Sequence, residues 1–414
     1  HIETNQPSLR WAGIDLPFQE ATRNFFIAGA ISSGKTISLR LLMQSFVPLI
    51  DQRSDLRALI YDAKRDMVSI IKGMNATCPL HILIPFDVRC SVWALHQDIT
   101  NRADALAVAT CLTPPKPVKA SAGDFWIEAA RYILEGLSLY FALVAQGDWE
   151  LRDILIGARS VERLQAIFQS SKITEEYLYL VGGDRLTHSV LVTVQVYLSQ
   201  FEPIAAAWHY KHRHAKDNGL PLQTFCFTDW VHENAVTLLG RDVEHAPTMA
   251  ALNRLFFTLA GRKLLNKHPK DLDRSPTSFL VLDEAHTLGY LSELEELATN
   301  GSGHGVSLAL AVQSIGSLQN IYGQERTEAV LGQFFHKVFL RLNDTLTAEF
   351  ASNLIGRADR FQQFFDGRGW RISNQVESNV LVVSPEELRR IAPPEKGHSG
   401  FFNWLVGRGG SPLK

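Results

Sequence analysis

The clearest chemical spacing in the chain belongs to a glycine-bounded loop at Gly29–Thr36. It reads Gly-Ala-Ile-Ser-Ser-Gly-Lys-Thr and fits the pattern G-x-x-x-x-G-K-[ST]. Glycines remove Cβ bulk, so successive backbone N–H groups can point at phosphate oxygens. The pattern predicts that Lys35 reaches the β- and γ-phosphates of ATP and that the Thr36 hydroxyl ligates Mg²⁺. The other phosphate-binding positions that we expect are Gly29, Ser32, Ser33 and Gly34.

A chance match in a loop rich in glycine and serine is the alternative explanation. The flanking segments argue against it, because the apolar run Asn24–Ala28 precedes the loop and Ile37–Phe46 follows it with helical periodicity. A helix that begins near Lys35 would add the positive end of its dipole to the phosphate site. Strand, loop and helix together favour a nucleotide site.

Two acids end a second apolar run. Phe279–Leu282 is followed directly by Asp283 and Glu284. In phosphoryl-transfer enzymes with such a loop, a carboxylate at the end of a neighbouring strand holds Mg²⁺. We therefore predict that Asp283 binds the metal and that Glu284 is the general base for the attacking water. The alternative is a strand that ends at a helix N-cap, where acids are also common.

Gln313 ends the next apolar run, Ser307–Gln313. An amide at the carboxyl end of a strand beside the acidic strand lies where the γ-phosphate or the attacking water would be. We predict a catalytic contact for Gln313. An ordinary polar residue at a strand end is the alternative.

The segments that must hold these residues alternate between strand and helix. Apolar runs without polar alternation are typical of parallel strands buried on both faces. Besides Asn24–Ala28, we predict strands at Arg57–Asp62, Leu80–Ile84, Ala235–Gly240, Phe279–Asp283, Ser307–Gln313, Lys337–Leu342 and Val380–Val383. This alternation predicts an α/β fold with a mostly parallel sheet.

From about Asn101 to Leu222 the signals are helical. Apolar residues recur there at the three-and-four spacing of one helix face: Phe125, Trp126, Ala129, Ala130, Ile133, Leu134, Leu137 and Phe141. A second such helix is expected at Leu186–Phe201, with loops at Pro114–Lys119 and Gly182–Gly183. The sequence thus predicts an all-α domain inserted into the α/β domain.

Composition bounds the possible partners. With 46% hydrophobic and 20% charged residues, the 414-residue chain has the balance of a soluble globular protein with a sizeable core. A net charge of −2 gives no support to a nucleic-acid partner from charge alone, so any basic DNA contacts must be local. The four cysteines show no CxxC spacing, which argues against a zinc site or a redox pair.

No apolar stretch reaches the roughly 18 residues of a membrane-spanning helix. The best candidate, Tyr132–Ala145, is too short and carries Glu135. The chain begins with His1 rather than methionine. We interpret it as a fragment or a processed product, whose parent could carry an N-terminal membrane anchor.

Further phrases accompany these motifs in a fixed order: Tyr61–Lys64 (YDAK), Ile84–Trp93 (IPFDVRCSVW), Phe125–Ala130 (FWIEAA), Ile321–Gly323 (IYG) and Lys337–Arg341 (KVFLR). With the loop, the acid pair and Gln313, this order resembles the type IV secretion coupling proteins (TraD/TraG-like), relatives of the FtsK/HerA hexameric DNA motors. The resemblance covers about Leu9 to Trp404. Its more specific parts are Asp87–Trp93 and the FW-x-x-A-A helix.

The resemblance implies a RecA-like P-loop NTPase core at residues 1–100 and 223–414, with the all-α domain at 101–222. It implies a homo-hexamer around a channel, on the cytoplasmic side of the bacterial inner membrane and held there by a segment absent from this chain. It implies ATP-driven delivery of DNA (single- or double-stranded, relaxase-bound) or of effector proteins to the secretion machinery. On that pattern Gln313 is the sensor beside Lys35, Thr36, Asp283 and Glu284.

One position departs from the family's pattern. Coupling proteins commonly carry an arginine in a T-x-G-R-x-x-G phrase, which reaches the neighbouring subunit's ATP. Here the phrase is Thr299–Gly305, and Ser302 stands in the arginine's place. Since such an arginine neutralises transition-state charge, its loss weakens the case for a fast motor. Arg341 and Arg357 are the candidate substitutes.

Three other groups have a structural and a functional explanation. The basic run His209–Lys216 is either a solvated helix end, which we favour, or a contact for a phosphate backbone or a metal. Asp62 and Lys64 form either an ion pair or part of the nucleotide site. The tryptophans of the insert are more often core residues than stacking platforms for bases: Trp126, Trp149 and Trp208.

Two rival functions fit the same residues. One is a soluble hexameric DNA translocase or defence ATPase of the FtsK/HerA type, without a membrane tie. The other is a recruitment platform that binds ATP without hydrolysing it, which the serine at position 302 leaves open.

Overall fold

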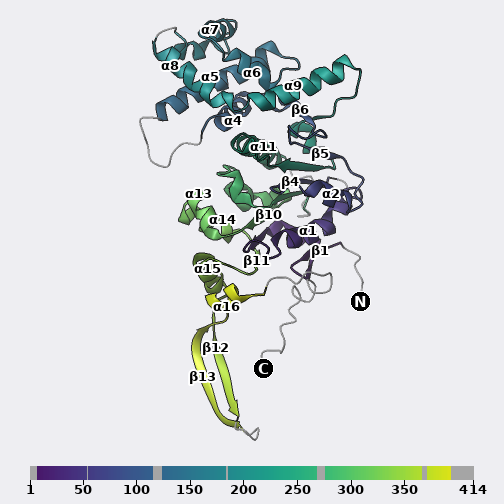
Figure 1. Ribbon diagram of the computed structural model, residues 1–414, viewed down its shortest axis with the longest axis vertical. Helices are drawn as coiled ribbons and strands as arrows, with labels where there is room; N and C mark the ends of the chain where they lie inside the picture. The colour runs from purple at the N-terminus through teal and green to yellow at the C-terminus, as the bar shows by residue number, and fades with distance from the viewer. Residues whose placement is uncertain are drawn as a thin grey trace. The chain divides into compact units, whose positions relative to one another are not determined.

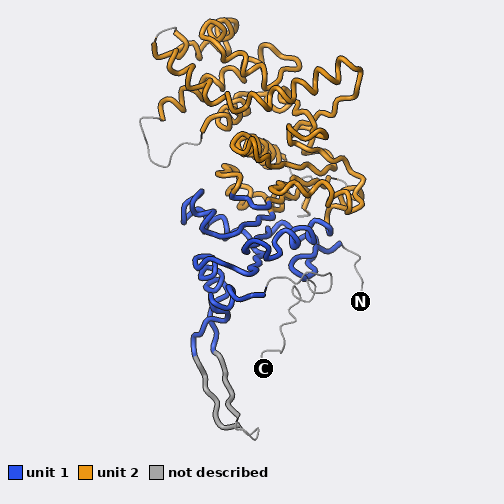
Figure 2. Tube along the Cα trace, viewed as in Figure 1, with its two compact units in different colours: residues 1–45, 283–286, 309–414 blue, residues 46–282, 287–308 orange. Residues whose placement is uncertain are grey.

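The computed structural model describes residues 7–53, 55–114, 124–182, 185–267, 276–365 and 371–392, with the backbone alone at 360–365 and 371–377. The chain divides into two compact units (Figure 2). Unit 1 comprises residues 1–45, 283–286 and 309–414, and unit 2 comprises residues 46–282 and 287–308. Apart from Pro114 and Gly182, the two predicted loops at Pro114–Lys119 and Gly182–Gly183 lie outside the described residues.

A seven-stranded sheet has the strand order β11-β3-β10-β9-β4-β8-β5. The pairings of β3 with β10 and β11, of β4 with β8 and β9, and of β5 with β8 are parallel. The strands are β3 (Phe25–Ala28), β4 (Arg57–Asp62), β5 (Leu80–Ile82), β8 (Val236–Gly240), β9 (Ser278–Leu282), β10 (Val306–Val312) and β11 (His336–Phe339). Every residue of β3, β4, β8, β9 and β10 is buried, which explains their continuous apolar sequences.

Unit 1 places the ends of three strands at one edge of the sheet. In the parallel register, Ala28 lies opposite Val312 on one side and Phe339 on the other. The residues that follow β3, β10 and β11 therefore leave the sheet in the same direction. The other elements of this unit are β1 (Ser8–Trp11), β2 (Ile14–Pro17), η1 (Phe18–Arg23), α1 (Lys35–Phe46), α13 (Ile315–Tyr322), α14 (Gln324–Gly332), α15 (Thr345–Ile355) and α16 (Pro385–Arg390).

The predicted strand at Val380–Val383 is wrong as a member of the parallel sheet. Its first two residues end β13 (Arg371–Leu381), which pairs antiparallel with β12 (Arg357–Phe365) in a separate two-stranded hairpin. Val380 and Leu381 are half-buried and Val382 is 46% exposed, so this apolar run does not have both faces covered. Backbone pairing within the hairpin, rather than burial in the sheet, makes it a strand.

Unit 2 combines the remaining sheet strands with a helical region. Near the sheet lie η2 (Val47–Leu49), α2 (Met67–Lys72), β6 (Val92–Trp93), α3 (Leu95–Asp98), β7 (Thr224–Phe225), α10 (Phe227–Trp230), α11 (Ala246–Asn266), α12 (Leu294–Asn300) and η6 (Gly301–His304). The helical region holds α4 (Arg102–Leu112), α5 (Asp124–Tyr140), the π-turn η3 (Phe141–Ala145), α6 (Leu151–Gly157), α7 (Val161–Gln169), η4 (Glu175–Leu180), α8 (Arg185–Ser199) and α9 (Glu202–Asp217). Helices α4–α9 lie together in Figure 1.

Helix α5 is the centre of the helical region and packs on α4, α7 and α8. It buries most of the face that the spacing predicts, namely Ala129, Ala130, Ile133, Leu134 and Leu137. Phe125 at its start is 49% exposed, so the buried face is shorter than expected. Gly136 lies against the buried ring of Tyr177, where an added Cβ would come within 2.6 Å of the ring.

The helical signals therefore lie where the sequence places them, but the domain boundaries at 100/101 and 222/223 stay a prediction, since the two compact units divide the chain elsewhere. In the described ranges, no single helix is long and apolar enough to cross a membrane. Helices α8 and α9, which meet at a bend of 62°, meet that criterion only when taken together.

Candidate functional site

The loop between β3 and α1 has the backbone of a phosphate cradle. Ser32 has a φ of 60° and Gly34 a φ of 107°, both in the left-handed region that favours glycine. An added Cβ at Gly29 would lie 2.4 Å from the Ser33 Oγ and 2.9 Å from the Leu340 Cβ. The N–H groups of Ser32 and Gly34 donate no hydrogen bond to any residue the structure describes, which leaves them available to an anion.

The loop is held from the neighbouring strand ends. The Gly29 N–H donates to the Val312 carbonyl at 3.2 Å, and the Ala30 N–H donates to the Arg341 carbonyl at 2.8 Å. Ser33, 1% exposed, donates its N–H back to the Ala30 carbonyl at 3.2 Å. The ends of β10 and β11 thus fix the shape of the loop before any ligand is considered.

Lys35, the first residue of α1, is 4% exposed and folds its side chain into the loop. Its Nζ donates to the carbonyls of Gly29 at 2.6 Å and of Ala30 at 3.2 Å. The same Nζ lies 3.5 Å from the Glu284 Oε1. A buried ammonium thus lies between loop carbonyls and an acid from a distant part of the chain.

The acid pair joins this loop, as the sequence predicts for a shared site. Asp283 follows β9 directly, is 1% exposed and accepts a hydrogen bond from the Thr36 Oγ1 at 3.2 Å through its Oδ2. Glu284 is 7% exposed and has a φ of 55°, which is unusual for a residue with a side chain. The structure therefore brings together one ammonium, one hydroxyl and two carboxylates from segments about 250 positions apart.

Gln313 lies directly after β10, beside the strand that leads into the loop. It is half-buried and forms no hydrogen bond with another described residue. Its neighbour Ser314 accepts the Ser317 N–H at 3.3 Å as the N-cap of α13. The catalytic role of Gln313 stays a prediction.

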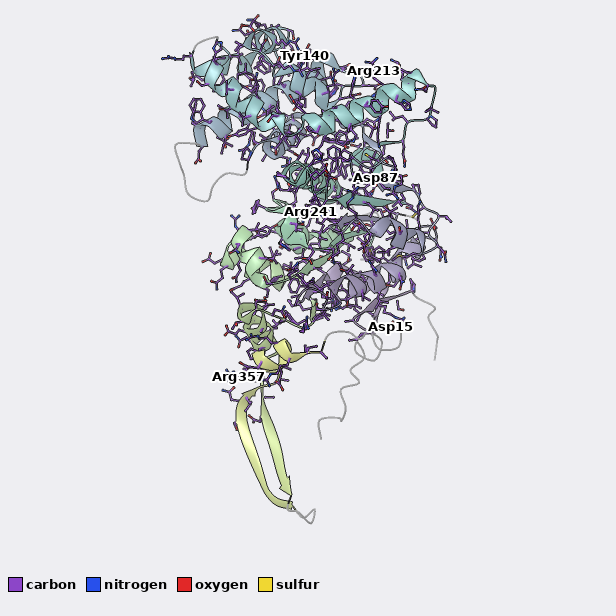
Figure 3. All side chains as sticks on the ribbon, in the orientation of Figure 1. Asp15, Asp87, Tyr140, Arg213, Arg241 and Arg357 are labelled. Atoms are coloured by element: carbon purple, nitrogen blue, oxygen red, sulfur yellow. The ribbon has the colours of Figure 1, made fainter. Side chains whose placement is uncertain are left out.

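Three residues bear on the role of the arginine in the family pattern: Ser302, which occupies its position, and the candidate substitutes Arg341 and Arg357. Ser302 is exposed in the short turn η6. Arg341 contributes its carbonyl to the loop, as described above. Arg357 opens β12 (Figure 3), is exposed, and donates from its guanidinium to the Asn379 carbonyl at 3.0 Å. Arg357 is thus tied to the hairpin, and neither arginine is assigned a role by these contacts.

Asp62 has a different set of partners from Asp283. Its carboxylate accepts the N–H groups of Lys64 at 3.1 Å, Arg65 at 2.8 Å and Met67 at 2.8 Å. Burial is the largest influence on the pKa of Asp62 and raises it. The backbone hydrogen bonds lower this pKa and the neighbouring Asp66 raises it, both less strongly than burial. The hydrogen-bond partners of Asp62 are backbone groups of the turn into α2. Whether Asp62 and Lys64 form an ion pair or part of the nucleotide site stays a prediction.

The basic run on α9 is engaged within unit 2. Glu150, at the start of α6, is hydrogen-bonded to two histidines of the run. Its Oε2 lies 3.1 Å from the His209 Nδ1, and its Oε1 lies 2.5 Å from the His212 Nδ1. The Lys211 ammonium donates to the carbonyls of Asp87, Val88 and Cys90. No cluster of three or more metal-ligating side chains occurs in the described residues. These contacts favour a structural role for much of the run.

The tryptophans of the helical region also favour packing. Trp208 is 3% exposed and lies edge-on to Trp93, and Trp149 is 5% exposed against the ring of Phe141. Trp126 is half-buried at the start of α5. The first two are core residues and are unavailable for stacking on bases.

Sequence reasoning missed one residue beside the acid pair. His286 lies in η5 (Ala285–Leu288), and its Nδ1 is 3.6 Å from the Glu284 Oε2. The signal was present, because the histidine stands only two positions after the proposed base. A histidine at such a position is easily taken for an ordinary turn residue.

The sequence model of the type IV secretion-system coupling protein DNA-binding domain matches residues 8–365. The chain belongs to this family. The resemblance drawn from the motifs is thereby confirmed.

Two curated relatives show how much of such proteins this chain represents. The coupling protein TraD of Escherichia coli (strain K12) is 22% identical over 360 residues, which are 84% of this chain and 46% of TraD. The conjugal transfer protein TraG of Rhizobium radiobacter is 24% identical over 323 residues, which are 73% of this chain and 48% of TraG. The chain spans about half the length of these relatives.

Solved structures share the fold. The bacterial conjugative coupling protein TrwBdeltaN70 superposes with a TM-score of 0.72 at 19% identity, over 95% of this chain and 85% of that one. TrwB in complex with ADP and Mg²⁺ gives a TM-score of 0.69 at 20% identity over 95% and 85%. VirB4 of Thermoanaerobacter pseudethanolicus gives 0.51 at 12% identity over 93% and 98%. These matches confirm the predicted class, a RecA-like α/β core with a mostly parallel sheet and an all-α insertion.

Proposed function

We propose that this coupling-family chain binds Mg-ATP between the loop Gly29–Thr36 and the acids Asp283 and Glu284, hydrolyses it, and thereby drives substrate into a type IV secretion or conjugation system. The observation that carries the proposal is the convergence of the loop lysine and threonine on the acid pair, at 3.5 Å and 3.2 Å. A chance match to the loop pattern would not bring two acids from a distant strand to these two side chains.

The residues suit a nucleotide with its metal. The undonated N–H groups of Ser32 and Gly34 and the ammonium of Lys35 would hold the phosphates. The Thr36 hydroxyl and the Asp283 carboxylate are oxygen donors of the kind that Mg²⁺ prefers. Mg²⁺ held by these two residues would supply positive charge against the negative charge that develops on the phosphate oxygens. TrwB, a protein of the same fold, has been solved with ADP and Mg²⁺ and with an ATP analogue, which supports ATP and Mg²⁺ as ligands here.

In this proposal Glu284 accepts a proton from the attacking water. As the water oxygen bonds to the γ-phosphorus, the bond from that phosphorus to the β–γ bridging oxygen breaks and ADP leaves. The proton that the water loses goes to the Glu284 carboxylate. Gln313, from the neighbouring strand end, would orient the water or sense the γ-phosphate.

The partners follow from family membership rather than from the surface. We assign DNA, single- or double-stranded, and relaxase or effector proteins as substrates, and the secretion machinery as the acceptor. The working form is a homo-hexamer at the inner membrane, with this chain on the cytoplasmic side and membrane contact through a segment outside it. The family's description as a DNA-binding domain and the relatives' descriptions as conjugal transfer proteins support this assignment.

A second function has one observation in its favour. Ser302 is exposed where the family pattern has a charge-neutralising arginine. A chain that binds ATP but turns it over very slowly would serve as a nucleotide-controlled recruitment platform. The two functions share the site and differ in rate.

An ATPase assay separates these functions. Wild type, Lys35→Ala and the exposed control Lys72→Ala are compared over a range of protein concentrations, with and without single-stranded DNA. The motor predicts turnover that rises with concentration and DNA, is lost in Lys35→Ala and persists in Lys72→Ala. Turnover that is unchanged in Lys35→Ala refutes the site. ATP binding with a flat, near-zero rate in an oligomer supports the platform.

A further inference from the structure

Glu284 lies beside a lysine and a histidine side chain, one at each oxygen of its carboxylate. Its Oε1 lies 3.5 Å from the Lys35 Nζ, and its Oε2 lies 3.6 Å from the His286 Nδ1. The side chains of Lys35 and Glu284 are 4% and 9% exposed, and that of His286 is 27% exposed. The carboxylate is thus enclosed between a buried lysine and a histidine that reaches the solvent.

We propose that His286 is a positioning residue for hydrolysis, which holds the Glu284 carboxylate toward the attacking water once a triphosphate has drawn Lys35 away. This inference rests on the proposed ATPase function. It assigns to His286 a role that neither the loop pattern nor the acid pair supplies.

The backbone explains why a holder is needed. Glu284 has a φ of 55°, a conformation that is unfavourable for a residue with a side chain and persists only where its surroundings fix it. In this conformation the side chain leaves the end of β9 toward Lys35 and the loop. A base displaced by about 1 Å can lose roughly 100-fold in rate, so the orientation of this carboxylate decides the turnover.

The choice of holder follows from what Lys35 must do. The loop pattern assigns its ammonium to the β- and γ-phosphates, and that ammonium is now within 3.5 Å of Glu284. When phosphate oxygens take the ammonium, the Oε1 of Glu284 loses this cation and the Oε2 still faces His286. A small rotation of either side chain brings 3.6 Å into hydrogen-bond range. The Nδ1–H donates both in one neutral tautomer and in the imidazolium, so the role needs no change of protonation.

A purely structural explanation is that His286 packs in the turn η5 and contacts Glu284 incidentally. That explanation predicts that its removal lowers stability or nucleotide affinity, and that no other side chain replaces it specifically. A positioning role predicts a loss in kcat with little change in KM, because the contact matters after the substrate is bound. The two explanations differ in quantities that one set of variants can measure.

The experiment compares wild type with His286→Ala and His286→Asn, and with both changes in a Glu284→Gln background. We expect His286→Ala to lower kcat about 10-fold with KM within about twofold, as for a lost contact to a general base. His286→Asn should recover most of this loss, because the Asn Nδ2 can donate from nearly the place of the ring Nδ1. In Glu284→Gln, the added His286→Ala should change kcat no further. His188→Ala, an exposed histidine on α8, is the control and should match wild type.

Unchanged kcat in His286→Ala, or a loss that His286→Asn does not relieve, overturns the inference. A second readout is independent of turnover: the ring ¹⁵N signals of His286 in protein labelled at histidine, assigned by their disappearance in His286→Ala. We expect these signals to shift in Glu284→Gln and again on addition of Mg-ATP. If the ring signals shift neither in Glu284→Gln nor on addition of Mg-ATP, the inference is overturned, even if wild type hydrolyses ATP. A wild type without ATPase activity instead counts against the proposed function, and the ring signals still decide the role of His286.

Discussion

Two buried aspartates stand at the ends of two buried strands, and their hydrogen bonds distinguish them. Asp62 ends β4 and accepts three backbone N–H groups from the next five residues. Asp283 follows β9 and accepts a hydrogen bond from the hydroxyl of Thr36, 247 positions away in the sequence. An acid that accepts hydrogen bonds from the backbone of its own turn stabilises that turn. An acid that is hydrogen-bonded to a side chain from a distant segment brings two segments together at a shared site.

The largest effect should come from removing one charge at the second aspartate. We expect Asp283→Asn to lower ATP turnover by at least about 100-fold, because a neutral amide is a poor ligand for a metal that neutralises the transition state. The matched change, Asp62→Asn, should leave turnover within about threefold. Steady-state ATPase rates at saturating Mg-ATP, with circular dichroism to check folding, measure both. Equal losses in the two variants would erase the distinction.

The second effect concerns stability, and here the Asp62 variant should lose more than the Asp283 variant. Asp62→Ala removes the acceptor of the buried Met67 N–H and of two partly buried N–H groups, so we expect the free energy of unfolding to fall by about 2 kcal/mol. Asp283→Ala should be neutral or stabilising, because it removes like-charge repulsion with the adjacent buried Glu284. Chemical denaturation of both variants with an unchanged m-value is the measurement. A more stable Asp62→Ala would show that the turn does not depend on this carboxylate.

A third strand end, at Gln313 after β10, carries an amide instead of an acid and tests the same distinction between catalytic and structural residues. Gln313→Ala should lower turnover about 10-fold and leave stability unchanged, since no described residue bonds to this amide. Its neighbour provides the matched control: Ser314→Ala removes the N-cap of α13 and should cost about 1 kcal/mol of stability while turnover persists. Identical profiles for the two variants would argue that Gln313 is also only a helix-start residue.

The smallest expected effect is a pH dependence at Asp62. Burial raises the pKa of Asp62 above the value it has in the unfolded chain, so the native state keeps this proton to higher pH. Its contribution to stability is therefore largest in acid and is lost as the pH rises through the raised pKa. The difference in unfolding free energy between wild type and Asp62→Asn should shrink by about 1 kcal/mol or less over that interval. A difference that grows with pH would mean that the backbone bonds outweigh burial.

Much of the site could be predicted from the sequence because each of its motifs directly follows an apolar strand. The loop at Gly29–Thr36 and the acids at 283 and 284 each follow a continuous apolar run, and the structure places both runs as fully buried strands. Parallel strands end at the same edge of a sheet, so side chains that follow them converge without further information. The ligand roles of these residues remain predictions that the variants above would test.

What the sequence left out depends on contacts that have no local signal. Val380 and Leu381 are as apolar as a sheet strand but lie in a hairpin, because register and pairing are set between strands and not within one. His286 became visible only when the fold placed its ring beside Glu284. The partners of Asp62 were also hidden, since a strand-end acid has the same sequence whether it closes a turn or binds a metal.

The contacts of Lys211 set a limit on how α9 could meet a polyanion. Its ammonium is occupied by the carbonyls of Asp87, Val88 and Cys90, while Arg213, labelled in Figure 3, and Lys216 are exposed. Each phosphate neutralised on double-stranded DNA contributes about −0.9 to the slope of log affinity against log salt. A duplex held through the exposed cations of this helix would therefore release counterions for two charges and show a slope near −2 from this helix, however basic the run reads in one-letter code.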